Sequence, residues 1–154
     1  MSRYQSLNFI VLETIKTPMI KQQSIILPPL GRGFHLVTDN IMQQLGPLPN
    51  CGLLHLFIQH TSAGICINEN ADPTVLHDFE IIFNQLVPEN IKGIRHTYEG
   101  PDDMPAHIKS TLTGHELTIP ITNHQLNLGT WQGIYYCEFR NHRSSRHLIA
   151  TIYS

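Results

Sequence analysis

The apolar positions of the N-terminal half alternate or cluster in short runs, which predicts mainly β-structure. Four segments have the pattern of strands: residues 6–17, 22–27, 53–59 and 64–69. The proline pair at 28–29 and the Gly-Arg-Gly sequence at 31–33 predict a turn after the second strand. The segment from 34 to 45 differs, because apolar residues recur there every four positions and predict a short amphipathic helix.

A second helix is predicted after the polar residues that follow residue 69. Asp72 suits the N-cap of that helix and Pro73 suits its first turn. Pro88 ends it, and the predicted buried stripe comprises Val75, Leu76, Phe79, Ile82, Phe83 and Leu86. A third helix is expected roughly from Pro105 to Leu112, with Gly114 as its C-terminal glycine.

The remaining chain is predicted to be β-structure. Its strands are expected at residues 116–121, 126–129, 131–139 and 147–153. About eight strands and about three helices result, and the sequential hairpins at the end favour an α+β fold built on an antiparallel β-sandwich. With 154 residues and no linker or repeat, the chain is expected to form a single domain over 1–154.

Composition narrows the classes of function. Charged residues make up 14% of the chain, against about 25% in typical soluble domains, which hints that another subunit covers part of the surface. A net charge of −2 argues against nucleic acid as a partner. No apolar run approaches the roughly eighteen residues of a membrane helix. Three isolated cysteines and the absence of a recognisable signal sequence predict a cytoplasmic protein.

The ten histidines are the one compositional outlier, and one of them lies at a suggestive distance from a carboxylate. In the segment DDMPAHIK, Asp103 and His107 are four residues apart and would share one helix face. Such a pair can hold a divalent metal or share a proton. In the alternative interpretation, Asp103 only caps the helix and His107 is solvated.

The stretch HTSAGICINENADP, residues 60–73, contains further candidates. His60 would be the polar end of an alternating apolar row, a position where a hydrogen-bonded core histidine is commoner than a ligand. Thr61, Ser62 and Gly64 could donate hydrogen bonds to a phosphate, although no glycine-rich loop precedes a helix here. Glu69 contributes little to a turn and could be a general base or an outer partner of a metal.

A third group of candidates lies in GTWQGIYYCEFR, residues 129–140. Trp131 beside Gln132 would suit a planar ring ligand, but a buried structural tryptophan is the commoner explanation. Glu138 and Arg140 lie on one strand face and could simply pair with each other. Cys137 shows no neighbouring sign of activation and is interpreted as a small core residue.

Together, HTSAGICINENADP, GPDDMPAHIKSTLTG, LTIPI and LGTWQGIYYCEFR resemble the YjbQ family of uncharacterised proteins (UPF0047). The resemblance covers about residues 9–153, and the motifs occur in order at family-like intervals. Some members carry the label "secondary thiamine-phosphate synthase". The resemblance implies a homotrimeric α+β antiparallel sandwich, a divalent metal (zinc or magnesium) at a site that contains histidine, and a weak thiamine phosphate synthase activity.

The same resemblance implies a set of site residues. These are His60, Glu69, Asp103, His107, Trp131, Gln132 and Glu138. Within the set, His60, Asp103 and His107 are expected to hold the metal. One departure is visible, because Asn123, His124 and Gln125 stand where family members usually carry a glycine-arginine pair.

Three functional hypotheses remain open from the sequence. The first is a transferase that joins a pyrimidine methyl diphosphate to a thiazole phosphate, with Trp131 beside the pyrimidine. The second is a non-catalytic homotrimer that binds a metal or a small ligand, for which a small phosphorylated molecule is a candidate. The third is another metal-assisted hydrolase or lyase at the same residues. Few lysines or arginines accompany the motifs, which counts against a diphosphate site.

Overall fold

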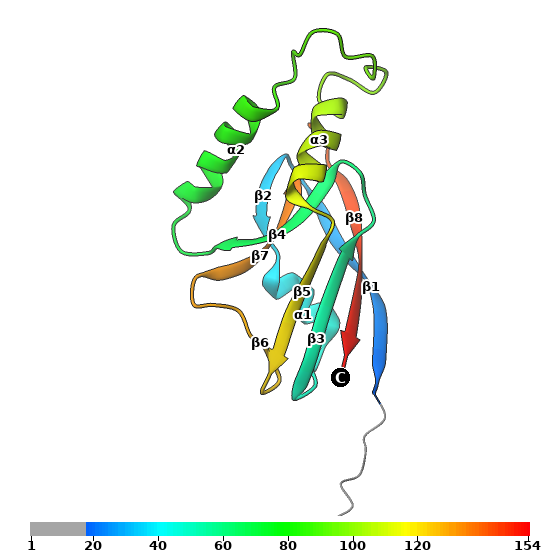
Figure 1. The fold of residues 1–154 in the computed structure, drawn as a ribbon, viewed down its shortest axis with the longest axis vertical. Coiled ribbons are helices and arrows are strands. Elements are labelled where there is room, and N and C mark those ends of the chain that lie inside the picture. The colour runs from blue at the N-terminus through cyan, green and yellow to red at the C-terminus, as the bar shows by residue number, and fades with distance from the viewer. Residues whose placement is uncertain (1–17) are drawn as a thin grey trace, which may run out of the picture.

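The computed structural model describes residues 18–154, so the strand expected over 6–17 lies outside the described residues. The strands are β1 (Ile20–Leu30), β2 (Gly33–Leu36), β3 (Cys51–Ile58), β4 (Ala63–Glu69), β5 (Glu116–Thr122), β6 (Gln125–Leu126), β7 (Gln132–Glu138) and β8 (Ser144–Tyr153). The helices are α1 (Thr38–Leu45), α2 (Thr74–Leu86) and α3 (Asp103–Thr113). Figure 1 shows these elements on the ribbon.

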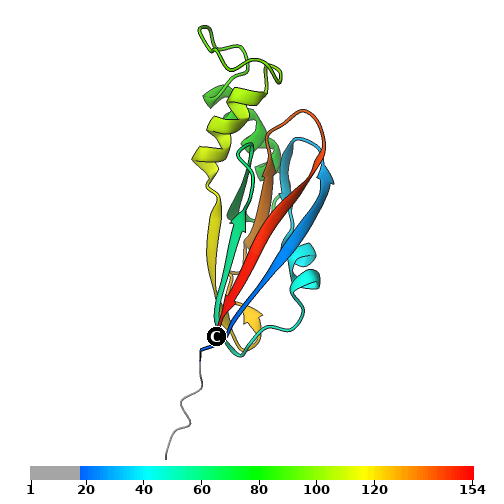
Figure 2. The same ribbon diagram turned by 90° about the vertical axis from the view of Figure 1, so that its right-hand side faces the viewer.

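The strands form two antiparallel sheets that pack face to face. One sheet has the strand order β1-β8-β3-β5-β6 and the other has the order β2-β7-β4. In Figure 2, β4 and β7 lie behind β3, β8 and β1. Apolar side chains from both sheets share one buried cluster, which includes Leu54, Leu56 and Ile119 from the first sheet and Ile65, Ile134 and Tyr136 from the second. The predicted α+β antiparallel sandwich is therefore confirmed.

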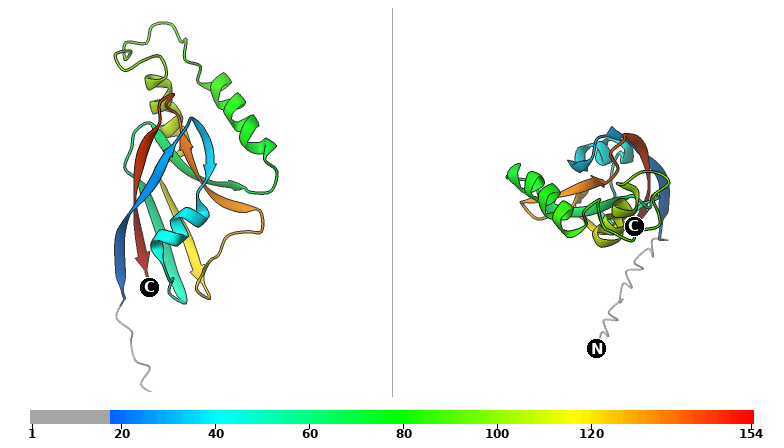
Figure 3. Two further views of the ribbon diagram at one scale, coloured as in Figure 1. Left: turned by 180° about the vertical axis from the view of Figure 1, so that it is seen from behind. Right: turned by 90° about the horizontal axis from the view of Figure 1, so that it is seen from above.

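A second, smaller apolar cluster lies on the outer face of the three-stranded sheet. Its buried members are Phe34, Ala106, Tyr135, Cys137 and Phe139. Helices α2 and α3 cover this face, as the two views of Figure 3 also show. The alternation along β7 thus sends Tyr136 between the sheets and Tyr135 and Cys137 under the helices, as the strand period requires.

Two predictions in the N-terminal half were correct only in part, because the turn after the second strand is confined to Gly31 and Arg32 and the helix is shorter than predicted. β1 continues through the proline pair to Leu30, with an irregularity of register between Leu27 and Leu30. Because β1 is the edge strand of its sheet, the missing proline N–H groups cost it little. The helix expected over 34–45 begins only at Thr38, since Phe34 and its neighbours pair with β7 as strand β2.

The predicted stripe of α2 is only partly correct. Leu76, Phe79 and Phe83 pack against the outer cluster as half-buried residues. Ile82 and Leu86, however, are 51% and 66% exposed, and no residue of α2 is fully buried. The helix therefore rests on the body along a narrow line and leaves apolar side chains uncovered.

Candidate functional site

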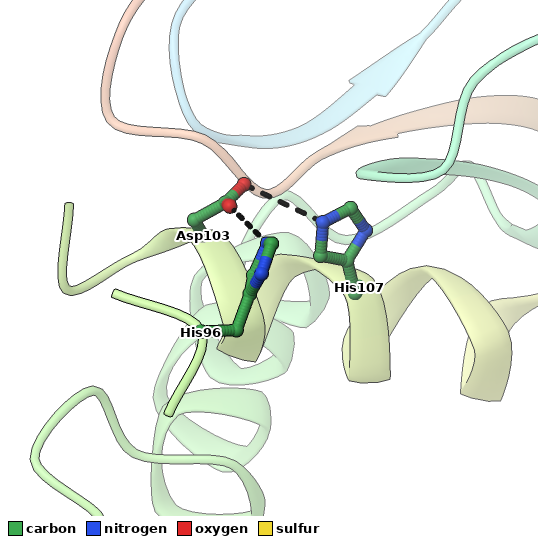
Figure 4. Close-up of side chains that lie close together, drawn as sticks. All are labelled: His96, Asp103 and His107. Carbon is green, nitrogen blue, oxygen red and sulfur yellow. Dashed lines mark ion pairs between the residues drawn. The ribbon is translucent and has the colours of Figure 1, made fainter. Parts of the chain in front are cut away.

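Helix α3 brings two of the predicted site residues together. Asp103 is the first residue of the helix and His107 follows one turn later, so both side chains lie on one face. His107 Nε2 is 3.5 Å from Asp103 Oδ1. The predicted pairing of these two residues is therefore present in the structure, as Figure 4 shows.

The structure adds His96, which the sequence arguments did not select. It lies on the connection between α2 and α3, and its Nε2 is 2.7 Å from Asp103 Oδ2. One ligand atom from each of His96, Asp103 and His107 lies within 4.8 Å of the others, and Figure 4 shows the three side chains converging. We call these three residues the His-Asp-His group. Only the length of the connecting loop could have pointed to His96, because no fixed spacing relates a loop residue to the following helix.

Asp103 is the buried centre of the group. Its side chain is 2% exposed, whereas those of His96 and His107 are 52% and 31% exposed. Although His96 Nε2 is close, the pair lacks hydrogen-bond geometry, and Asp103 Oδ2 is a buried oxygen without a hydrogen-bond partner. A buried carboxylate oxygen in this state calls for an explanation, and a bound water molecule or ion is one of those known in proteins.

His107 is held in one orientation by the backbone. Its Nδ1 is 2.8 Å from the carbonyl oxygen of Thr61, an acceptor, so Nδ1 carries the proton in that hydrogen bond. In the neutral imidazole this leaves Nε2 with a free lone pair on the side of Asp103. Histidine ligands of metals are commonly fixed by such a contact from the second nitrogen.

Arg140 fixes the carboxylates around the group. Its guanidinium donates to Asp102 Oδ2 at 2.9 Å and to Asp103 Oδ1, and it also contacts Glu99. Burial would raise the pKa of Asp102, but hydrogen bonds from the Asn141 backbone and from Arg140 outweigh it, so this pKa is lowered. Three carboxylates thus surround one guanidinium, and the excess negative charge favours a cation.

The donor set fits a divalent cation. Two imidazole nitrogens and one carboxylate are the protein ligands of many catalytic zinc sites, and a tetrahedral centre with bonds of about 2.1 Å places its ligand atoms about 3.4 Å apart. His96 Nε2 lies 2.7 Å from Asp103 Oδ2 and His107 Nε2 lies 3.5 Å from Asp103 Oδ1, so the two imidazoles approach the two oxygens of one carboxylate. The orphaned Oδ2 and the orientation of His107 agree with this fit.

His60, the third ligand expected from the resemblance, lies outside the His-Asp-His group. Its Nε2 accepts a hydrogen bond from the backbone N–H of His147 at 2.8 Å, and its Nδ1 faces Arg146 Nη1 at 3.4 Å. Burial lowers the pKa of His60, and the positive charges of Arg146 and His147 lower it further. Neither ring nitrogen is directed at the group.

Glu138 is fully buried and is part of an ion pair between the sheets. It accepts hydrogen bonds from Arg146 Nε at 2.9 Å and Nη2 at 2.7 Å, and from the hydroxyl of Tyr136. Burial and the contact with Glu138 raise the pKa of Tyr136. The suggestion that Glu138 pairs with the side chain of Arg140 was wrong, because only the Arg140 backbone N–H contacts it.

The other predicted site residues lie at the opposite end of β7. Glu69 is the last residue of β4 and pairs with Gln132, the first residue of β7, next to Trp131. Arg140, beside the His-Asp-His group, follows the other end of this seven-residue strand, which spans roughly 20 Å. Trp131 is 64% exposed and is therefore no core tryptophan. Within one chain these residues do not face the group.

Residues 123–125, which differ from the glycine-arginine pair expected from the resemblance, lie at the tight turn between β5 and β6. Asn123 and His124 both have positive φ, 52° and 64°. His124 Nδ1 contacts the carbonyl oxygen of Leu48 at 2.9 Å, so this histidine has a partner within the fold.

The fold and the His-Asp-His group define an α+β two-sheet sandwich with a convergent polar site beside its outer sheet. Solved structures share the fold: a YbjQ-like protein of unknown function from Sulfolobus solfataricus P2 has a TM-score of 0.77 at 22% identity, over 90% of this chain and 99% of the other. A YjbQ/UPF0047 protein from Clostridium acetobutylicum has a TM-score of 0.72 at 34% identity, over 84% and 98%.

Sequence comparison gives the family. The model of the UPF0047 protein YjbQ-like family matches residues 23–154. The UPF0047 protein YjbQ of Escherichia coli O157:H7 is 51% identical over 133 residues, which cover 85% of this chain and 96% of that protein. The chain belongs to the YjbQ (UPF0047) family. Within residues 18–154, no helix has the length and apolar character needed to cross a membrane.

Proposed function

We propose that the protein binds a divalent cation through His96 Nε2, the Asp103 carboxylate and His107 Nε2. The observation that carries the proposal is the convergence of these three ligand atoms on a buried carboxylate oxygen that has no hydrogen-bond partner. Two imidazoles favour zinc over magnesium, which prefers oxygen ligands. This ligand set replaces His60, expected from the resemblance, with His96.

The protein residues around the cation would determine what it can do. Three protein ligands leave a tetrahedral position open, and the partial exposure of His96 and His107 leaves the group accessible from solvent. A cation held there would supply Lewis-acid chemistry for hydrolysis, elimination or group transfer. Arg140 and the Thr61 carbonyl would fix the Asp103 and His107 side chains, so that they need no reorganisation.

Among the three functional hypotheses that the sequence leaves open, the metal-assisted hydrolase or lyase agrees best with this geometry. Thiamine phosphate synthesis would require Trp131 beside the reacting ring, and Trp131 lies at the far end of β7 in the same chain. That activity and the homotrimer stay predictions. Metal or ligand binding without turnover is the second candidate. The exposure of the His96 side chain agrees with either candidate.

Metal content per chain tests the proposal and separates the two ligand sets. Proteins purified without chelators would be compared by elemental analysis as wild type, His96→Ala, His107→Ala and His60→Ala, with His55→Ala as the matched control. We expect near-stoichiometric metal in the wild type, His60→Ala and His55→Ala, and its loss in the other two. Loss in His60→Ala together with retention in His96→Ala would restore the ligand set of the resemblance. No metal in any protein would reject the site.

A further inference from the structure

A separate cavity of about 380 Å³ lies at the end of β3, beyond the Thr61 carbonyl that orients His107. It is lined by Phe57, Ile58, Gln59, His60, Thr61, Ser62, His115 and Arg146. No carboxylate is among these lining residues, although Glu138 lies buried behind Arg146. Arg146 can only donate hydrogen bonds, and the hydroxyl, imidazole and amide groups of the other polar lining residues can also donate.

Two of these donors lie side by side without an acceptor between them. His60 Nε2 accepts the backbone N–H of His147, so the single proton of the neutral ring is on Nδ1. That N–H lies 3.4 Å from Arg146 Nη1, which can only donate. An oxygen atom that accepts from both groups would relieve this juxtaposition, and an anionic oxygen would do so best.

Two nearly buried polar side chains complete the cavity wall. Ser62 and Arg146 are only 8% and 7% exposed. Ser62 is one of the residues that line the cavity, and its hydroxyl can donate a hydrogen bond to a bound oxygen atom. Arg146 uses Nε and Nη2 to bind Glu138, which fixes the guanidinium and leaves Nη1 for the cavity.

We propose that this cavity binds the phosphoryl group of a small phosphorylated molecule through His60 Nδ1, Arg146 Nη1 and the Ser62 hydroxyl. Because Glu138 occupies one edge of the guanidinium, Arg146 cannot offer that edge to a planar carboxylate, and donors on three separate side chains suit a tetrahedral oxyanion better. The inference does not depend on the cation. It gives His60 a role as a donor to the ligand, and places that ligand one residue from the contact that orients His107.

The experiment is a calorimetric titration of the full-length, metal-free protein with inorganic phosphate in the presence of a chelator. Ser62→Ala removes one donor with little change of volume, and His60→Phe keeps a ring but removes Nδ1–H. His55→Phe is the matched control, because His55 lies on β3, the strand that leads to His60, and is outside the cavity lining. We expect one phosphate per chain in the wild type. We expect affinity about tenfold weaker or worse in Ser62→Ala and His60→Phe, and unchanged in His55→Phe.

Absence of phosphate binding to the wild type would overturn the inference. Phosphate affinities in Ser62→Ala and His60→Phe that equal the wild-type affinity would also overturn it. Sulfate and acetate would each be tested as competitors of phosphate. If acetate, a planar carboxylate, competed as well as tetrahedral sulfate, the preference for a tetrahedral ligand would be rejected. Arg146 is not truncated, because its loss would leave Glu138 buried without a partner. Circular dichroism would establish that each variant folds, and Ser62→Ala alone decides the outcome if His60→Phe does not fold. Because the protein is metal-free, the result is independent of the proposed metal site.

Discussion

Arg140 stabilises the two adjacent carboxylates at the start of α3. Its side chain is 5% exposed, and those of Asp102 and Asp103 are 8% and 2% exposed. Replacing Arg140 with methionine would leave two buried carboxylates without their guanidinium. We expect Arg140→Met to lower the free energy of unfolding by about 3–5 kcal/mol in urea denaturation of the metal-free protein. The double variant Asp102→Asn/Arg140→Met should recover part of this loss. A loss below about 1 kcal/mol would show that solvent screens the network.

His60 gives the protein a pH dependence of stability. Its folded pKa lies below the ordinary value of 6.5, chiefly through burial, so between these two values the unfolded chain binds more protons. Stability is therefore lost as the pH falls from 6.5 toward the folded pKa. We expect the free energy of unfolding to drop less between about pH 7.5 and pH 5 in His60→Phe than in the wild type. A wild-type slope in His60→Phe, with His55→Phe as control, would contradict this assignment.

The contact between β4 and α3 sets the position of the His-Asp-His group at the scale of elements. A Cβ atom on Gly64 would lie 2.8 Å from Cβ and Cγ2 of Thr113, closer than such atoms approach in proteins. The Ser110 hydroxyl also donates to the Ala63 carbonyl oxygen at 2.7 Å, which fixes the helix on the strand. Only glycine at position 64 allows α3 to lie this close to the sheet.

We expect Gly64→Ala to lower the free energy of unfolding by about 1–3 kcal/mol, because α3 must shift to relieve the contact. The same shift should weaken metal binding, since α3 carries Asp103 and His107. Urea denaturation and metal titration measure the two effects. Gly64→Ala/Thr113→Ser, which removes Cγ2, should recover part of both. Wild-type stability and metal affinity in Gly64→Ala would show that the helix position is not set by this contact.

The whole molecule leaves apolar side chains of α2 uncovered. Ile81, Ile82 and Leu86 are 43%, 51% and 66% exposed, and Trp131, the residue just before β7, is 64% exposed. Exposed apolar surface of this kind commonly marks an interaction site. It agrees with the homotrimer that the resemblance implies and with the low charge content of the chain.

We expect the wild-type mass in sedimentation equilibrium to equal three chains. Leu86→Glu would place a charge in the apolar surface of α2, and we expect it to shift the protein toward the single chain. Tyr98→Glu is the matched control, because Tyr98 is 99% exposed on the loop between α2 and α3. A wild-type monomer would reject the trimer, and a trimeric Leu86→Glu would place the interface away from α2.

The sequence by itself determined the class of fold and two of the three residues of the His-Asp-His group. Strand alternation and helix spacing depend on neighbouring residues, so they predicted the β5–β8 region, α3 and the pairing of Asp103 with His107. Motif order indicated the YjbQ family, which the family model then confirmed. The limits of local pattern appear at 34–45, where strand pairing with β7 overrode the helical spacing of the first residues.

Only the tertiary structure decided which polar residues meet. His96 joins Asp103 through a loop whose path no local spacing encodes, and Glu138 pairs with Arg146 across the two sheets. His60 faces Arg146 because β3 and β8 are neighbours, while Trp131, Gln132 and Glu69 lie at the far end of β7. The reason is physical: periodicity fixes the face on which a side chain lies, but strand order and packing fix its partner.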